Sequence, residues 1–236
     1  YEAALQTAQA GLKTLVIDKS KKDIGGVCLN EGCIPAKTYL QSAEFFLKKD
    51  FLFELGIDLE IKGFELIRLK NKADALKDEI RAGVSWLLDQ AGVECLYANA
   101  VFKDTNLLEA NGQDISFKKC IIATGSIVKE SPLLPIDGKF IISSKEVFDL
   151  KSLPKSITIV GAGAIGCEFA TFFNALGVEV TLILRKEQIL SSQDLDISKA
   201  LLREFRKRNI NVITSATILN TTIQNQSVTL EIKEEI

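Results

Sequence analysis

The sequence predicts an α/β protein with parallel sheets, because the order of a βαβ unit can be read twice, once in part and once in full. In the first instance, residues 2–10 form an Ala/Gln-rich helical pattern that ends at Gly11, and the apolar run 13–17 ends in Asp18. Helix, glycine, strand and acid make up the second half of such a unit, so we expect its first strand and glycine turn to precede Tyr1. The second instance follows residue 155.

Between the two instances the sequence predicts two long helices and then a small antiparallel insertion. Apolar residues recur at three- and four-residue spacing in residues 64–91, and residues 37–48 show a similar helical pattern. Beyond residue 92 the pattern changes to short β-rich runs separated by turn signals such as Asn111-Gly112. These runs are residues 94–101, 107–110, 115–117 and 119–123, and we expect the last of them to be a buried strand.

The second instance is complete and indicates a parallel sheet with helices on its faces. A connector spaced by Pro132, Pro135 and Pro154 leads into it. Its expected elements are the strand 156–160, the turn 161–166, the helix 167–176, the strand 179–184, the helix 194–209 and the strand 211–215. Residues 227–232 are predicted to be one arm of a hairpin that is cut off by the end of the chain.

Composition limits the kinds of function. The chain has 236 residues, enough for one or two domains, with 29 basic and 31 acidic residues. This balance argues against nucleic acid as a partner, and no apolar run reaches the roughly 18 residues of a membrane span. The absence of histidine excludes an imidazole base and the common zinc sites from these residues, and we expect no metal. Five cysteines in a chain of this size favour a reducing compartment, the cytoplasm. Three of them, Cys95, Cys120 and Cys167, lie in apolar contexts and are expected to be buried.

The glycine turn of the second unit reads Gly161-Ala-Gly163-Ala-Ile165-Gly166. It follows a predicted strand and opens a predicted helix, which is the setting in which GxGxxG binds a dinucleotide. Gly161 would permit the tight turn, Gly163 would let the backbone approach a pyrophosphate, and Gly166 would let helix and strand pack closely. The alternative is a glycine turn that serves packing only.

The residues after the next strand bear on which dinucleotide is bound. An acid at this place would hold the ribose hydroxyls of NAD, but the sequence reads Leu184-Arg185-Lys186-Glu187. A basic residue such as Arg185 is the usual means of accommodating the 2′-phosphate of NADP. Because Glu187 lies close by, and Arg185 could equally be a solvated loop charge, NAD and NADP both stay open.

Cys28 and Cys33 form the pair that needs an explanation. Cysteines five positions apart lie about 140° apart around a regular helix, so a disulfide requires the residues between them to leave helical geometry. Asn30 and Gly32 are suited to that, and Pro35 suits the first turn of the helix that follows. A zinc site lacks further ligands, and a purely structural disulfide is an unusual choice in a reducing compartment. We therefore favour a redox-active pair.

The stretch GGVCLNEGCIPAK, residues 25–37, resembles the active-site segment of the pyridine nucleotide-disulfide oxidoreductases and is most similar to that of the dihydrolipoamide dehydrogenases. IIATGS, residues 121–126, resembles the family's closing flavin motif, and IVGAGAIGCEFA, residues 159–170, resembles its NAD(P) turn. The resemblance implies two Rossmann-like domains: an FAD-binding domain over residues 1–150, without its first strand and glycine turn, and an incomplete NAD(P)-binding domain over residues 151–236. It further implies a homodimer formed by a C-terminal domain that is absent, so we interpret the chain as a fragment.

The resemblance also implies roles for individual residues. Cys28 would exchange with a dithiol substrate, and Cys33 would contact the flavin. Lys37 matches a lysine near the flavin ring and Glu168 its carboxylate partner, and we expect a buried pair that holds the two domains together. The implied cofactor-binding residues are Asp18, Gly26, Lys37, Thr124 and Gly125 for FAD, and Gly161, Gly163, Ile165, Gly166 and Arg185 for the nucleotide.

The implied enzyme uses FAD and NAD to convert dihydrolipoamide, on a lipoyl carrier protein, and NAD+ to lipoamide and NADH. Val27, Ala36 and Leu184 stand where the family usually has Thr, Ser and Glu, and the last departure leaves NADP possible as the cofactor. An NADP-dependent disulfide or mercuric reductase is therefore one alternative. A non-catalytic flavin- or nucleotide-binding subunit is another.

Overall fold

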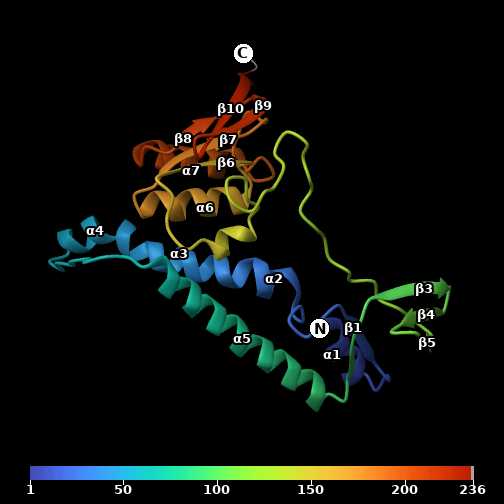
Figure 1. Cartoon of the computed structure of the whole chain (residues 1–236). Helices are drawn as coiled ribbons and strands as arrows, with labels where there is room; N and C mark the ends of the chain where they lie inside the picture. The colour runs from blue at the N-terminus through green and yellow to red at the C-terminus, as the bar shows by residue number, and fades with distance from the viewer. Residues whose placement is uncertain (235–236) are drawn as a thin grey trace. The chain divides into compact units, whose positions relative to one another are not determined.

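A computed structural model describes residues 1–234 (Figure 1). The contacts between residues group the chain into two compact units. Unit 1 comprises Tyr1–Pro35 and Ala73–Ile127, and unit 2 comprises Ala36–Lys72 and the chain from Val128 onwards. Each unit takes residues from both sides of position 100, because two long helices run across the boundaries between the units. The expected FAD- and NAD(P)-binding domains, divided at residue 150, are defined by the cofactor that each would bind, whereas the two units are defined by contacts between residues. The domain division therefore stays a prediction.

Unit 1 contains the partial βαβ arrangement that the sequence predicts. Strands β1 and β2 pair in parallel, with Leu15 opposite Glu94 and Asp18 opposite Tyr97. A small core of Ala4, Ile24, Val84, Leu88 and Val93 joins the first helix, the chain before the cysteine pair and the end of the longest helix. The elements are α1 (Glu2–Gln9), β1 (Leu15–Asp18), α2 (Gly26–Glu31), the later part of α5 (Leu66–Gln90) and β2 (Glu94–Tyr97).

The antiparallel insertion is confirmed as a three-stranded sheet in the order β3-β4-β5. Its strands are β3 (Ala100–Asp104), β4 (Leu107–Ala110) and β5 (Gln113–Ser116). The run expected as one strand over 94–101 is split between β2 and β3, because Ala98 and Asn99 leave the strand conformation. The two strands belong to different sheets, since β2 pairs with β1 and β3 pairs with β4.

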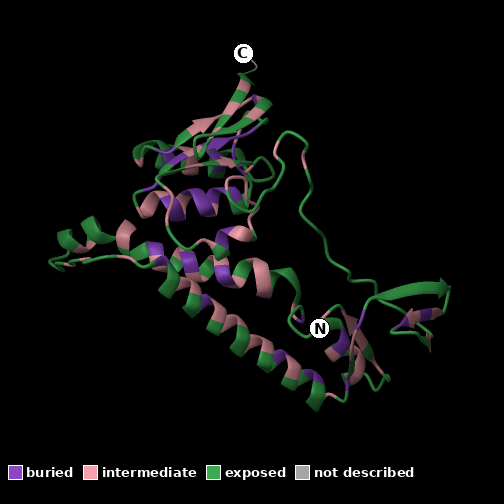
Figure 2. Cartoon of the chain, viewed as in Figure 1, coloured by how far each residue is buried: buried purple, intermediate pink, exposed green. Residues whose placement is uncertain are grey.

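The prediction of a buried strand at residues 119–123 is wrong. These residues form neither helix nor strand, and Ile121 and Ile122 are 64% and 68% exposed. A strand needs a neighbour to hydrogen-bond its backbone, and within the described residues β1 and β2 pair only with each other. The exposed segment is seen as an uninterrupted green trace in Figure 2. Cys120 and Cys95 are exposed as well, so the expectation that they are buried is also wrong.

Unit 2 contains the complete βαβαβ arrangement. Strands β6, β7 and β8 form a parallel sheet in that order, with Ile157 opposite Val180 and Leu182 opposite Val212. The α/β class with parallel sheets is therefore confirmed. The elements of this arrangement are β6 (Ser156–Val160), α6 (Ala164–Ala175), β7 (Glu179–Ile183), α7 (Leu195–Lys207) and β8 (Asn211–Ile213). Preceding them are α3 (Cys33–Leu47), which begins in unit 1, α4 (Lys49–Glu54) and the short helix η1 (Glu146–Asp149).

The chain ends in a hairpin whose two arms are both present. Strand β9 (Ala216–Gln224) pairs antiparallel with β10 (Ser227–Glu234). The turn residues Asn225 and Gln226 have φ of 49° and 61°, the left-handed values that a two-residue hairpin turn requires. Residues 227–232 are thus the second arm, and the expectation of an arm cut off from its partner is wrong because the preceding residues supply the partner.

A cluster of aromatic side chains fills the interior of unit 2. Tyr39 of α3 lies with its ring centre 5.2 Å from that of Phe148 and 5.1 Å from that of Phe172 in α6. The Tyr39 hydroxyl donates a hydrogen bond of 3.4 Å to the carbonyl of Phe148. Figure 2 shows the inner face of α6 in the colour of buried residues. These contacts hold α3 beside α6, which positions the charged residues that precede Tyr39 and Phe172 on the two helices.

We expect Phe172→Ala to lower the free energy of unfolding by about 3 to 5 kcal/mol, because the ring is fully buried and its removal leaves a cavity. Phe45→Ala is the matched control, since Phe45 is 60% exposed and its loss should change the stability little. Denaturant titration of both variants measures the difference. Equal effects of the two substitutions would contradict the aromatic core.

Candidate redox site and nucleotide-binding turn

The cysteine pair lies where one helix ends and the next begins. Gly25 and Gly26, with φ of 93° and 71°, form the turn into α2, which carries Cys28. At Gly32 the backbone departs from helical angles, with φ −135° and ψ −115°, and Cys33 is the first residue of α3. The expected departure from helical geometry between the cysteines is therefore present.

Gly32 also lies close to the backbone at the start of α2. A Cβ atom at this position would stand 3.0 Å from the carbonyl oxygen of Val27 and 3.3 Å from the Cα of Cys28. Any other residue would thus press on the backbone that carries Cys28. The side chains of Cys28 and Cys33 are both exposed, as thiols that exchange with a substrate in solution must be.

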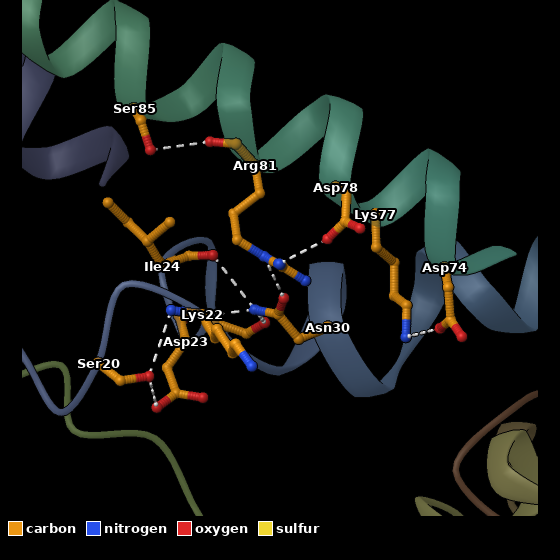
Figure 3. A network of polar contacts seen from close by, with 11 residues as sticks. Ser20, Lys22, Asp23, Ile24, Asn30, Asp74, Lys77, Asp78, Arg81 and Ser85 are labelled. Carbon is orange, nitrogen blue, oxygen red and sulfur yellow. Dashed lines mark hydrogen bonds and ion pairs between the residues drawn. The ribbon is translucent and has the colours of Figure 1, made fainter. Parts of the chain in front are cut away.

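Two residues near the cysteine pair, Asn30 and Arg81, were not predicted from the sequence to be functional. Asn30 donates to carbonyls of residues 23–26, where the chain enters α2, and Arg81 of α5 donates to the Asn30 side chain (Figure 3). Asn30 could have been singled out because it lies between the cysteines. Arg81 could not, because its side chain looks like one of many charges on an amphipathic helix.

Lys37 and Glu168 form an ion pair between α3 and α6 within unit 2. The packing of Tyr39 against Phe172 holds the two helices in place for this contact. The side chains are 61% and 32% exposed, so the expectation that the pair is buried is wrong in this chain. An exposed ion pair of this kind contributes little to stability, about 1 kcal/mol or less. Its role beside a flavin stays a prediction.

The glycine turn between β6 and α6 has the geometry expected of each glycine. Gly161 has φ 109° and its amide donates to the carbonyl of Ile183 at 2.8 Å. A Cβ at Gly166 would stand 1.9 Å from the carbonyl oxygen of Gly161, so only glycine fits there. Gly163 faces open space, with nothing within 4 Å of an added Cβ, and Ile165 is 60% exposed. The turn thus offers exposed backbone at the start of α6, which fits the pyrophosphate of a dinucleotide.

The loop after β7 lies next to this turn. The amide of Leu190 donates to the carbonyl of Ala162 at 2.7 Å, and the amide of Ala216 donates to the carbonyl of Leu184 at 3.0 Å. Leu184 is buried at 6% exposure, whereas Arg185 is exposed. The side chain that directly follows β7 is therefore part of the core, and the first side chain able to meet a ligand is basic.

The residues predicted to bind FAD lie in unit 1, apart from Lys37. Asp18 is half-buried at the end of β1, where its carboxylate accepts the amide of Lys19 at 2.7 Å. Gly26 has open space around it and a positive φ, which suits close approach of a ligand to the backbone. Thr124 and Gly125 lie in the exposed segment without regular structure. Their role as flavin ligands stays a prediction.

A model of the pyridine nucleotide-disulphide oxidoreductase family matches residues 1–236. The chain belongs to this family. Its members are flavin-dependent, and the dihydrolipoyl dehydrogenases among them use FAD and NAD. These are the two cofactors that the resemblance implies.

Individual relatives point to the same group of enzymes. The chain is 36% identical over 224 residues to a dihydrolipoyl dehydrogenase of Acholeplasma laidlawii, which covers 92% of the chain and 66% of that protein. It is 34% identical over 248 residues to a dihydrolipoyl dehydrogenase of Bacillus subtilis, which covers 100% of the chain and 52% of that protein. The chain thus spans about half to two thirds of these relatives.

Solved structures agree on the fold. LpdA from Mycobacterium tuberculosis superimposes with a TM-score of 0.85 at 22% identity, covering 98% of this chain and 51% of that one. The flavoprotein disulfide reductase RclA from Escherichia coli superimposes with a TM-score of 0.82 at 24% identity, covering 98% and 50%. Within residues 1–234, no helix combines the length and the apolar character needed to span a bilayer.

We expect Gly166→Ala and Gly163→Ala to have opposite effects. Alanine at 166 must displace the backbone at Gly161, which should lower the free energy of unfolding by about 3 kcal/mol or more. Alanine at 163 meets no protein atom, so it should keep the stability and weaken nucleotide binding. Thermal denaturation and a nucleotide titration of both variants measure this. Unchanged nucleotide affinity in Gly163→Ala would contradict a pyrophosphate site at the turn.

We expect Cys167 to resist alkylation while the exposed cysteines react. Burial in α6 raises the pKa of the Cys167 thiol to about 11, so at pH 8 only roughly one molecule in a thousand carries the reactive thiolate. Reaction with iodoacetamide at pH 8, followed by mass spectrometry of the peptides, measures the labelling. Raising the pH towards 11 should bring labelling of Cys167, and equal labelling of all five cysteines at pH 8 would show that α6 is not packed as described.

Proposed function

We propose that the chain is part of a flavin-dependent oxidoreductase that passes electrons between a dithiol and a pyridine nucleotide through Cys28 and Cys33. The favoured reaction is dihydrolipoamide + NAD+ → lipoamide + NADH + H+. The observation that carries the proposal is the exposed cysteine pair at the helix break of Gly32. The names of the relatives that are 34–36% identical support lipoamide as the disulfide product.

In this proposal each cysteine has its own role. A thiolate of dihydrolipoamide attacks the Cys28 sulfur of the oxidised pair, which forms a mixed disulfide and releases Cys33 as thiolate. The second substrate thiol then attacks the substrate sulfur of the mixed disulfide, which releases lipoamide and leaves both cysteines reduced. Two electrons and two protons have left the substrate. Bound FAD would supply the relay of these electrons to the nucleotide.

Other residues would hold the cofactors. Asp18 at the end of β1 would accept hydrogen bonds from the adenosine ribose of FAD, and Gly26 would allow the backbone to approach it. Lys37, paired with Glu168, would place a positive charge beside the flavin. In the second half of the chain, the turn at Gly163 would receive the pyrophosphate of the nucleotide.

The complete protein is proposed to act as a homodimer on lipoyl groups of a carrier protein, in the cytoplasm. The odd number of cysteines, five in a chain of this size, fits a reducing compartment. The relatives' names are the support for the lipoyl partner. Mass measurement of the complete protein in solution tests the dimer.

Anaerobic titration of the complete FAD-loaded protein with dihydrolipoamide tests the roles of the cysteines. We expect reduction of the pair to give a long-wavelength charge-transfer band from the Cys33 thiolate beside the flavin. Cys33→Ser should lose the band, whereas Cys28→Ser should lose turnover with the dithiol. Survival of the band in Cys33→Ser would overturn the assignment.

A second candidate is an NADP-linked reductase of another disulfide or of mercuric ion. It is favoured by the buried Leu184 and the exposed Arg185 after β7, where NAD binding would call for an acid. Comparison of kcat/KM for NADH and NADPH separates the candidates. For an NADP-linked enzyme, Arg185→Gln should lower kcat/KM for NADPH by about tenfold and leave that for NADH nearly unchanged, since only the 2′-phosphate contact is lost.

A non-catalytic flavin- or nucleotide-binding subunit is the remaining alternative. It predicts a complete protein that binds FAD but does not oxidise NADH or NADPH with any acceptor. Ferricyanide is a suitable acceptor, because it takes single electrons and needs no dithiol. The intact cysteine pair argues against this alternative, since a protein that only binds cofactors has no use for it.

A further inference from the structure

We propose that Arg81 is a positioning residue for the redox cysteine pair and that it acts through the side chain of Asn30. The proposal rests on the redox function proposed above. Arg81 lies on α5, 51 positions along the chain from Asn30, and its Nε donates to Asn30 Oδ1 at 3.2 Å. Figure 3 shows the guanidinium of Arg81 pointing from α5 towards the side chain of Asn30. Both residues belong to unit 1, as do both cysteines.

The Asn30 amide nitrogen faces three backbone carbonyls. It lies 3.2 Å from the oxygen of Asp23, 3.2 Å from that of Ile24 and 2.9 Å from that of Gly26. An amide has two hydrogens, so these three acceptors share them. Rotating the amide by 180° would set its oxygen against the three carbonyls and its NH2 group against Arg81. The three carbonyls and the arginine therefore together fix which way the Asn30 amide points.

Two of the three carbonyls belong to the turn that leads into α2, and the third is that of Gly26, the first residue of the helix. Within this turn, the amide of Gly26 donates to the carbonyl of Asp23 at 2.9 Å, and Ser20 Oγ donates to the Asp23 carboxylate at 2.9 Å. Helix α2 has only six residues, too few to be stable by itself, so its orientation depends on contacts such as these. Asn30 ties the body of α2 to the turn before it. Cys28 lies between them and takes its position from both.

Arg81 is itself held in place. Its Nη1 donates to Asp78 Oδ1 at 2.8 Å, and its side chain is 19% exposed. One guanidinium thus contacts both Asp78 and Asn30 through different nitrogens, which the single ammonium of a lysine cannot do with the same geometry. Lys77, one turn earlier, has a similar environment, with an ion pair of 2.7 Å to Asp74 and a side chain that is 15% exposed. It provides a matched control, because it does not bond to Asn30.

The test measures dihydrolipoamide oxidation by the complete FAD-loaded protein. We expect Arg81→Met to lower kcat by about tenfold while KM stays within about twofold, because a misplaced Cys28 slows the exchange rather than substrate binding. Arg81→Lys should lose a similar amount, since it keeps the charge but not the fork of donors. Lys77→Met should keep the wild-type rate. Turnover of the reduced nucleotide with ferricyanide should be unchanged in all three variants.

A double-mutant cycle tests whether Arg81 acts through Asn30. Asn30→Ala alone should lower kcat at least as much as Arg81→Met, and Arg81→Met should add less than about twofold when Asn30 is already alanine. Additive losses, full activity in Arg81→Lys, or a parallel loss of ferricyanide turnover would each overturn the proposal. Cys28→Ser tests the redox function separately from the role of Arg81. If that variant still oxidises dihydrolipoamide, the proposed redox function of the cysteine pair is itself wrong.

Discussion

The local structure at the cysteine pair depends on the close approach of Gly32 to the backbone of Val27 and Cys28 in α2. Because Gly32 has no side chain to press on the Val27 carbonyl, the chain can turn there and start a new helix at Cys33. On one continuous helix the two sulfurs would face directions about 140° apart, which is incompatible with a shared disulfide. The same break leaves α2 only six residues long. A short helix cannot hold a reactive cysteine by itself, so its position depends on contacts at both of its ends, and Asn30 provides one of them.

Much of this could be predicted from the sequence because the information is local. The helix break lies within six consecutive residues, and the GxGxxG turn lies within a strand-turn-helix segment whose periodicity is clear on both sides. The conformations of Gly161 and Gly166 follow from backbone sterics alone, so a sequence pattern is enough to expect them. The ion pair between Lys37 and Glu168 is different. It joins residues 131 positions apart, and only the resemblance to a family pointed to it.

The parts that could not be predicted depend on what lies beside a segment. Residues 119–123 have the composition of a buried strand, but a strand forms only where a neighbour accepts its hydrogen bonds, and composition carries no information on that neighbour. The exposure of Cys95 and of the Lys37 ion pair has the same origin, because burial is decided by elements that are remote in sequence. Arg81 is a further case. In the sequence it cannot be told apart from the solvent-exposed charges of an amphipathic helix. Its partner, Asn30, is evident only from the structure.

The end of β7 shows how packing can limit recognition. Leu182, Ile183 and Leu184 are all buried, as is usual in a parallel sheet that is covered on both faces. A carboxylate in place of Leu184 would be desolvated unless a ligand hydroxyl met it, and such burial is costly for a charge without a partner. With leucine there, the core gains apolar area and the strand end loses the group that reads a ribose. In the proposed nucleotide site, recognition of the adenosine end would then fall to the exposed residues that follow, and the first of these is Arg185, whose charge suits a phosphate better than a hydroxyl.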